Sequence, residues 1–171
     1  VYEVIIVGGS YAGLSAGLQL ARARRNVLVL DSGLRRNRFA ETSHGFLGQD
    51  GRAPEQIADE ARAQLLAYPS VQWLTDTAVE ATRTDSGFDL RTESGQWLST
   101  KRLILASGVI DELPDIDGLW QRWGQSVFHC PYCHGYEVFE GRIGVIGCAK
   151  DGGAAQALLL CDWGRITLFC S

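Results

Sequence analysis

A short apolar segment followed at once by a glycine-rich turn constrains the fold of this chain more than any other feature. Residues 2–7 are apolar and mostly β-branched, which predicts a buried strand of a parallel sheet. The turn, residues 8–13, reads Gly-Gly-Ser-Tyr-Ala-Gly, and residues 13–23 then repeat apolar side chains at helical spacing. Residues 26–31 supply a second apolar strand. The pattern predicts a β-α-β unit.

The turn has the composition of a cradle for a dinucleotide pyrophosphate. Between a strand and a helix, glycines let backbone N–H groups and the helix N-terminus face the phosphates. We expect Gly8 to make the tight turn and Gly13 the close helix–strand contact, while Ser10 stands where a glycine is usual. Asp31 ends the second strand, where a carboxylate can accept the ribose hydroxyls of the adenosine half. The alternative is a glycine turn with a capping aspartate and no ligand.

The remaining sequence predicts two nucleotide-binding-type domains. Residues 32–52 lack a clear period and predict a long connection over the surface or over a ligand. A helix is predicted for 54–66, strands broken by turns for 71–105, and a second strand, glycine turn, helix and strand for 142–169. We therefore expect an α/β fold: a Rossmann-like domain with a β-meander over 1–113, and the start of a second Rossmann-like domain over 114–171.

Composition excludes several other classes of protein. The net charge is -4, without a basic stripe that would follow a phosphate backbone, so we expect no nucleic-acid partner. No segment approaches the roughly 20 uninterrupted apolar residues of a membrane helix. The first residues lack the pattern of a secretory signal, so we expect a cytoplasmic protein.

Cys130 and Cys133 form a Cys-x-x-Cys pair, which brings two sulfurs within bonding distance across one turn. Pro131 favours the start of a helix at this point. Three other interpretations remain: half of a zinc site, although the other three cysteines form no second close pair; a c-type haem attachment, because His134 follows the pair; and two inert core cysteines.

Three segments resemble the low-molecular-weight thioredoxin reductase family of FAD-dependent disulfide oxidoreductases: residues 7–13, residues 106–108 (Ala-Ser-Gly) and residues 128–137 (Phe-His-Cys-Pro-Tyr-Cys-His-Gly-Tyr-Glu). The resemblance implies that 1–113 is the N-terminal segment of an FAD-binding domain and that 114–171 begins a pyridine-nucleotide-type domain carrying the cysteines. A C-terminal FAD segment, absent from this chain, would complete the first domain. The resemblance also implies a homodimer.

The resemblance assigns roles to individual residues. Cys133 is expected to face the flavin, and Cys130 to exchange with the disulfide of a thioredoxin-like protein or a small molecule. His134 stands where thioredoxin reductases usually have an acid, which resembles the branch of gliotoxin- and holomycin-type dithiol oxidases, and it could shuttle protons near neutral pH. The predicted FAD contacts are Gly8, Gly9, Ser10, Tyr11, Ala12, Gly13, Asp31, Ser32, Asn37, His44, Ala106, Ser107 and Gly108.

The sequence leaves open the electron donor and the direction of electron flow between flavin and cysteines. The second glycine turn, residues 147–152, departs from the family pattern, so the sequence does not decide between NADPH, NADH and ferredoxin as the donor. Residues 35–38 (Arg-Arg-Asn-Arg) either meet a phosphate or ribose or form a solvated loop. The alternatives to disulfide reduction are a dithiol oxidase that uses oxygen and a non-catalytic nucleotide-binding or redox-sensing module.

Overall fold

The computed structural model describes residues 1–138, 141–147 and 152–170 and divides into two compact units. Unit 1 comprises Val1–Phe39 and Ala53–Leu113, and unit 2 comprises Ala40–Arg52 and Pro114–Ser171. The two units therefore divide between residues 113 and 114, but the segment 40–52 groups with unit 2. The assignment of the units as FAD-binding and pyridine-nucleotide-type domains stays a prediction.

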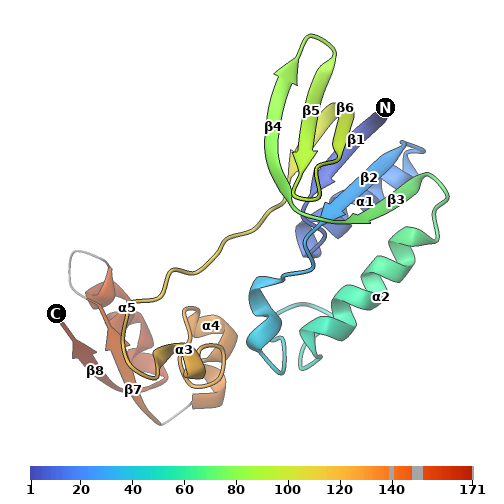
Figure 1. Ribbon diagram of the computed structural model, residues 1–171. Helices are drawn as coiled ribbons and strands as arrows, with labels where there is room; N and C mark the ends of the chain where they lie inside the picture. Colours follow the sequence, from blue (N-terminus) through green and yellow to red (C-terminus); the bar gives the residue numbers. More distant parts are fainter. Residues whose placement is uncertain (139–140, 148–151, 171) are drawn as a thin grey trace. The chain divides into compact units, whose positions relative to one another are not determined.

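Unit 1 is a six-stranded sheet with helices (Figure 1). The sheet has the order β3-β2-β1-β6-β5-β4; strands β3, β2, β1 and β6 pair in parallel, while β4, β5 and β6 form an antiparallel meander. The elements are β1 (Tyr2–Val7), α1 (Tyr11–Arg22), β2 (Val27–Asp31), the 3-10 helix η1 (Arg36–Phe39), α2 (Pro54–Leu66), β3 (Val71–Thr75), β4 (Ala78–Thr84), β5 (Gly87–Thr92) and β6 (Trp97–Leu105).

Alternate residues of the parallel strands supply the two hydrophobic clusters of unit 1, because successive side chains of a strand point to opposite faces. Val4 and Ile6 of β1 belong to a cluster with Leu14 of α1 and Leu65 of α2. Ile5, between them, belongs to a second cluster with Leu28 and Leu30 of β2 and Leu90 of β5. One sheet face is therefore covered by the helices and the other by the meander.

Unit 2 contains a second, smaller β-α-β arrangement. Strands β7 (Gly141–Ile146) and β8 (Gly164–Phe169) pair in parallel, and α5 (Gly153–Leu159) with the 3-10 helix η4 (Leu160–Asp162) connects them. Three short helical segments precede β7: α3 (Leu119–Arg122), α4 (Pro131–His134) and the 3-10 helix η2 (Tyr136–Val138). The α/β fold class is thus confirmed, including the parallel start of a second Rossmann-like arrangement. Residues 148–151 of the second glycine turn lie outside the described residues.

Element boundaries differ from the sequence prediction by one or two residues. Helix α1 begins at Tyr11 rather than at Gly13, because Ser10 has an extended backbone and occupies the N-cap position. Helix α2 spans the predicted 54–66, with Pro54 at its first position. Strand β2 begins one residue later than predicted, at Val27, and strand β7 begins one residue earlier, at Gly141.

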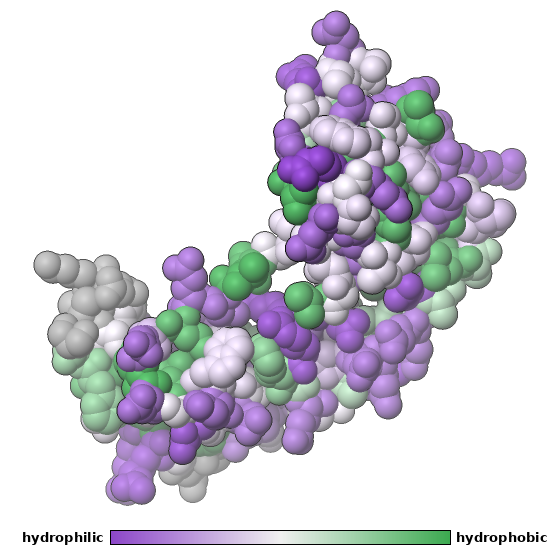
Figure 2. All heavy atoms as spheres, in the orientation of Figure 1, coloured by the Kyte–Doolittle hydropathy of each residue, from purple (hydrophilic) through white to green (hydrophobic). Residues whose placement is uncertain are grey.

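Large apolar side chains are exposed in both units. Leu47 of unit 2 and Ile110 of unit 1 are 98% and 94% exposed. On the face drawn in Figure 2, hydrophobic residues lie between hydrophilic ones. None of the described helices is long and apolar enough to cross a membrane.

Candidate functional site

The glycine turn is packed so tightly that side chains do not fit at its two ends. Gly8 has φ +102°, a conformation that favours glycine, and a Cβ there would overlap the backbone carbonyl of Ala106. A Cβ at Gly13 would overlap the carbonyl oxygen of Gly8. The Gly8 N–H donates to the Leu30 carbonyl at 2.8 Å. The turn is therefore held between the carboxyl ends of β1, β2 and β6.

Asp31 fixes the middle of the turn. The Gly9 N–H donates to Asp31 Oδ1 at 2.8 Å, and the Gly33 N–H donates to Oδ2 at 3.2 Å. The indole of Trp73 lies directly against Gly9, where an added Cβ would overlap it. Each carboxylate oxygen keeps a second lone pair after these bonds. The carboxylate can therefore hold the turn and still accept a hydroxyl.

The start of α1 suits an anionic ligand. Ser10 has φ -92° and ψ -163°, and its hydroxyl makes no capping hydrogen bond among the described residues. The Leu14 N–H donates to the Ser10 carbonyl at 2.8 Å. The N–H groups of the first turn thus point out of the helix, and no acidic residue occupies that turn. These features fit a pyrophosphate.

The structure brings most of the other predicted cofactor residues of unit 1 to this turn. Asn37 Nδ2 donates to the Tyr11 hydroxyl at 3.0 Å, and that hydroxyl donates to the Pro54 carbonyl at 3.3 Å. The Ala106 N–H donates to the Val7 carbonyl at 2.7 Å. Three further predicted residues are exposed and follow the carboxyl ends of β2 and β6: Ser32, Ser107 and Gly108.

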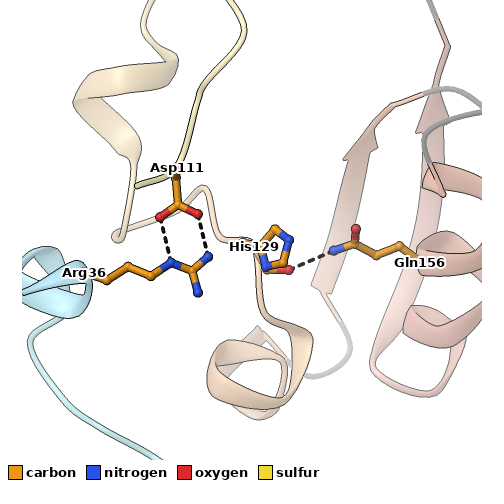
Figure 3. A network of polar contacts seen from close by, with 4 residues as sticks. All are labelled: Arg36, Asp111, His129 and Gln156. Atoms are coloured by element: carbon orange, nitrogen blue, oxygen red, sulfur yellow. Dashed lines mark hydrogen bonds and ion pairs between the residues drawn. The ribbon is translucent and has the colours of Figure 1, made fainter. Parts of the chain in front are cut away.

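Two arginines of the first connection, Arg36 and Arg38, have partners that the sequence does not predict. Arg36 donates from Nε to Asp111 Oδ2 at 2.8 Å and from its terminal nitrogen to Oδ1 at 2.5 Å, a two-point pair within unit 1 (Figure 3). Arg38 donates to the Arg35 carbonyl at 2.7 Å and lies over the ring of Phe39. Arg36 is therefore engaged by a carboxylate that lies 75 residues away in the sequence.

The cysteine pair lies at a single helical turn of unit 2. Cys130 is the N-cap of α4, with φ -96° and ψ 114°, and Pro131 occupies the first helical position as predicted. Both cysteines are half-buried. Tyr132, between them, is 70% exposed and meets Trp163 edge-to-face, with ring centroids 5.5 Å apart. The Gln156 amide donates to the His129 carbonyl at 3.0 Å, which ties α5 to the residue before the pair (Figure 3).

His134 ends this turn and is stacked on Phe128, with ring centroids 4.2 Å apart and an interplanar angle of 19°. Burial lowers the pKa of His134 below its ordinary value, the charge of Glu137 acts in the opposite direction, and His44 lowers it further. A neutral imidazole next to two thiols can accept and return a proton near neutral pH.

His44, which was predicted to bind the cofactor, lies with unit 2. Its Nε2 is 3.5 Å from Glu137 Oε1, its Nδ1 is 3.5 Å from Asp50 Oδ1, and its ring bonds with the Thr42 hydroxyl at 3.1 Å. The structure thus brings His44 to the cysteine segment and groups it apart from the glycine turn. Glu137 ends the segment 128–137 that resembles the family, but the sequence predicts no role for it. The cofactor and catalytic roles of all these residues stay predictions.

Comparisons with known proteins are consistent with this pair of sites. The sequence profile of the family "Pyridine nucleotide-disulphide oxidoreductase" matches residues 2–149. "Thioredoxin reductase tcpT" of Claviceps purpurea (strain 20.1) is 38% identical over 161 residues, which are 92% of this chain and 50% of the relative.

Two solved structures are similar over almost the whole chain. The oxidoreductase from Agrobacterium tumefaciens has a TM-score of 0.92 and 54% identity, covering 98% of this chain and 57% of its own. HlmI has a TM-score of 0.93 and 39% identity, covering 98% of this chain and 54% of its own. The chain thus spans about half the length of these proteins, and the predicted resemblance to thioredoxin reductases is confirmed. The chain belongs to the pyridine nucleotide-disulphide oxidoreductase family.

Proposed function

We propose that this chain supplies the flavin cradle and the redox-active cysteine pair of a thioredoxin reductase-like disulfide oxidoreductase. In this proposal electrons pass between FAD and the pair Cys130/Cys133, and the pair reduces the disulfide of a thioredoxin-like protein or of a small molecule. The observation that carries the proposal is the placement of both half-buried sulfurs on one helical turn that ends in His134. The names of the relatives and the family match support the same chemistry.

The proposed exchange needs only the two sulfurs and a proton carrier. The Cys130 thiolate attacks one sulfur of the substrate disulfide, so an S–S bond forms to Cys130 while the first substrate thiolate leaves. The Cys133 thiolate then attacks the Cys130 sulfur, which releases the second substrate thiolate. The pair has lost two electrons and become a disulfide, and the substrate has gained them. The two protons lost by the thiols go to the two departing thiolates, and His134 can carry one.

Unit 1 has the features needed to hold FAD. The first-turn N–H groups of α1 would face the pyrophosphate, and Asp31 would accept ribose hydroxyls beside Gly9. When bound, FAD would supply the electron pair that returns Cys130 and Cys133 to thiols. We further propose NADPH as the source of that pair, which the family match and the thioredoxin reductase relatives support. A homodimer as the assembled state, taken from the family resemblance, and the cytoplasm as the location, taken from the sequence, complete the proposal.

Cysteine variants test the proposal. Cys133→Ser should keep flavin bound, so the protein stays yellow, yet lose disulfide reduction by at least about 100-fold, because the second exchange step has no nucleophile. Cys161→Ser, at an exposed cysteine of η4, is the matched control and should react like the parent. Disulfide reduction is followed by the thiols released. Unchanged turnover in Cys133→Ser would reject the assigned chemistry.

Dithiol oxidation is a second candidate, favoured by the half-buried His134. A neutral imidazole can take the proton of an incoming thiol, which is what oxidation of a dithiol to a disulfide requires. The balanced reaction passes two electrons and two protons from the dithiol to oxygen, giving a disulfide and hydrogen peroxide. Peroxide formed in proportion to added dithiol, without a reduced nicotinamide, would favour this direction over disulfide reduction.

A further inference from the structure

Two segments of unit 1 leave the sheet on either side of the glycine turn. Strands β2 and β6 flank β1 and run parallel to it, and the last residue of β1, Val7, pairs with Leu30 and with Leu105. The carboxyl ends of the three strands therefore lie at one edge of the sheet, where ligands of open α/β sheets bind. The glycine turn follows the middle strand, the segment 32–39 follows β2, and the segment 106–113 follows β6.

An ion pair between Arg36 and Asp111 joins these two segments. Arg36 Nε donates to Asp111 Oδ2 at 2.8 Å and Arg36 Nη2 donates to Oδ1 at 2.5 Å, so both carboxylate oxygens are engaged (Figure 3). The side chain of Asp111 is only 17% exposed. A two-point pair is stronger and more specific in geometry than a single contact between exposed charges, and partial burial reduces its screening by salt. The pair thus closes a ring of chain around the carboxyl end of β1.

The 3-10 helix η1, which carries Arg36, is also tied to the helix that follows the glycine turn. Asn37 Nδ2 donates to the Tyr11 hydroxyl at 3.0 Å, and this hydroxyl donates to the Pro54 carbonyl at 3.3 Å. Tyr11 is the first residue of α1, whose first-turn N–H groups suit a pyrophosphate. The position of η1 therefore depends on two contacts, one with the start of α1 and one with the segment 106–113.

We propose that Arg36 and Asp111 are positioning residues that form a clasp over the glycine turn, and that this pair must open before a dinucleotide enters or leaves the cradle. Both bonds of the clasp join atoms of the chain itself, so its closure does not depend on a ligand atom. Breaking the clasp should therefore speed entry and release alike, and change the equilibrium affinity less than either rate. The loss of a direct contact with the ligand would instead act mainly on release. This inference rests on the proposed function, which assigns FAD to the cradle.

The test is the rate of FAD exchange in the parent protein and in two variants, Arg36→Gln and Asp111→Asn. Each variant removes one charge of the clasp and keeps a polar side chain of similar size. Entry and release of FAD should each become roughly three- to tenfold faster, the range expected for one partly shielded ion pair. Release is followed by flavin fluorescence after dilution of the loaded protein, and entry by stopped-flow mixing of FAD with the flavin-free protein.

A double variant shows whether the two residues act as one unit. If they act only through their pair, Arg36→Gln combined with Asp111→Asn should exchange FAD no faster than the more affected single variant. The matched control is Arg25→Gln. Arg25 pairs with Glu3 at 3.4 Å beside the amino ends of β1 and β2, at the opposite edge of the same sheet, and its loss should leave both rates at the parent value. Circular dichroism confirms that each variant is folded, and either single variant decides the test if the other does not fold.

The outcomes separate the clasp from the assignment of the cofactor. Faster entry and release in the single variants, no further increase in the double variant and an unchanged control support the clasp. If FAD binds but the rates do not move, if release alone becomes faster, or if the two effects multiply in the double variant, the clasp is overturned and the proposed function stands. If the parent protein takes up no FAD, the proposed function fails and the clasp fails with it.

Discussion

Replacing Gly13 by alanine sets two opposing effects against each other within α1. Alanine in a helix interior is favoured over glycine by about 1 kcal/mol. Against that gain, the new Cβ would overlap the Gly8 carbonyl and come within 3.3 Å of Ile6 Cγ2. Overpacking of this kind costs about 1–3 kcal/mol, and the upper end applies because the obstacle is backbone that is itself bound to its neighbours. We expect Gly13→Ala to lower the free energy of unfolding by about 2 kcal/mol net.

Gly17→Ala is the matched control, one turn further along α1. Its Cβ would meet the methyl groups of Leu65 at 2.9 and 3.4 Å and of Ile6 at 3.5 Å, which are side-chain ends that can rotate slightly. We expect this variant to lie within about 1 kcal/mol of the parent, because the helix gain offsets the smaller strain. Urea denaturation followed by circular dichroism measures both, at an unchanged m-value. If Gly13→Ala proves as stable as Gly17→Ala, the close approach of α1 to the turn is not rigid and the reasoning fails.

Three further predictions follow from burial, charge and titration. Leu90→Ala should lower the free energy of unfolding by about 2–5 kcal/mol in urea denaturation, because Leu90 of β5 is fully buried against Ile5 and the leucines of β2; a loss under about 1 kcal/mol would contradict that packing. Asp31→Asn should weaken flavin binding about tenfold or more in a fluorescence titration, since a charge-assisted hydrogen bond contributes about 1.5–3 kcal/mol, and an unchanged affinity would remove Asp31 from the site. Because burial lowers the pKa of His134 below 6.5, the folded chain binds fewer protons than the unfolded one just below that pH. Stability should therefore decrease as the pH falls below about 6.5, and His134→Gln should remove that part of the decrease; an identical pH dependence in the variant would show that His134 is not its source.

Local signals account for the parts of the fold that the sequence predicted. The strand at residues 2–7, the glycine turn after it and the acid at the end of β2 were each predicted from residues close together in the chain. The structure contains all three features. Helix α2 was predicted to its end residues because Pro54 begins it and Pro69 disfavours its continuation. The cysteine turn was predicted for the same reason, since Pro131 sets the backbone at its first position.

Contacts between distant segments could not be predicted in the same way. Arg36 and Asp111 are 75 residues apart, and nothing in either neighbourhood identifies the other as its partner. His44 was expected to lie beside the flavin because it belongs to the first long connection. Its contact with Glu137 joins the segment 40–52 to η2, and neither stretch of sequence identifies the other as its partner.

The hydrogen bond from Gly9 to Asp31 explains why the cradle can be ready before a ligand arrives. A buried backbone N–H that lacks a partner is destabilising by about 1–3 kcal/mol, so the carboxylate of Asp31 stabilises the fold in addition to its proposed role at a ribose. Trp73 packs on the same glycine, and the guanidinium of Arg62 lies 4.2 Å above the indole, which limits movement of the ring. Since α2, β2 and β3 all hold this peptide, ligand binding need not order it, and little affinity is lost to ordering. If unit 1 binds FAD as proposed, the acid at the end of β2 would serve both the fold and the recognition of the ribose through the same two oxygens.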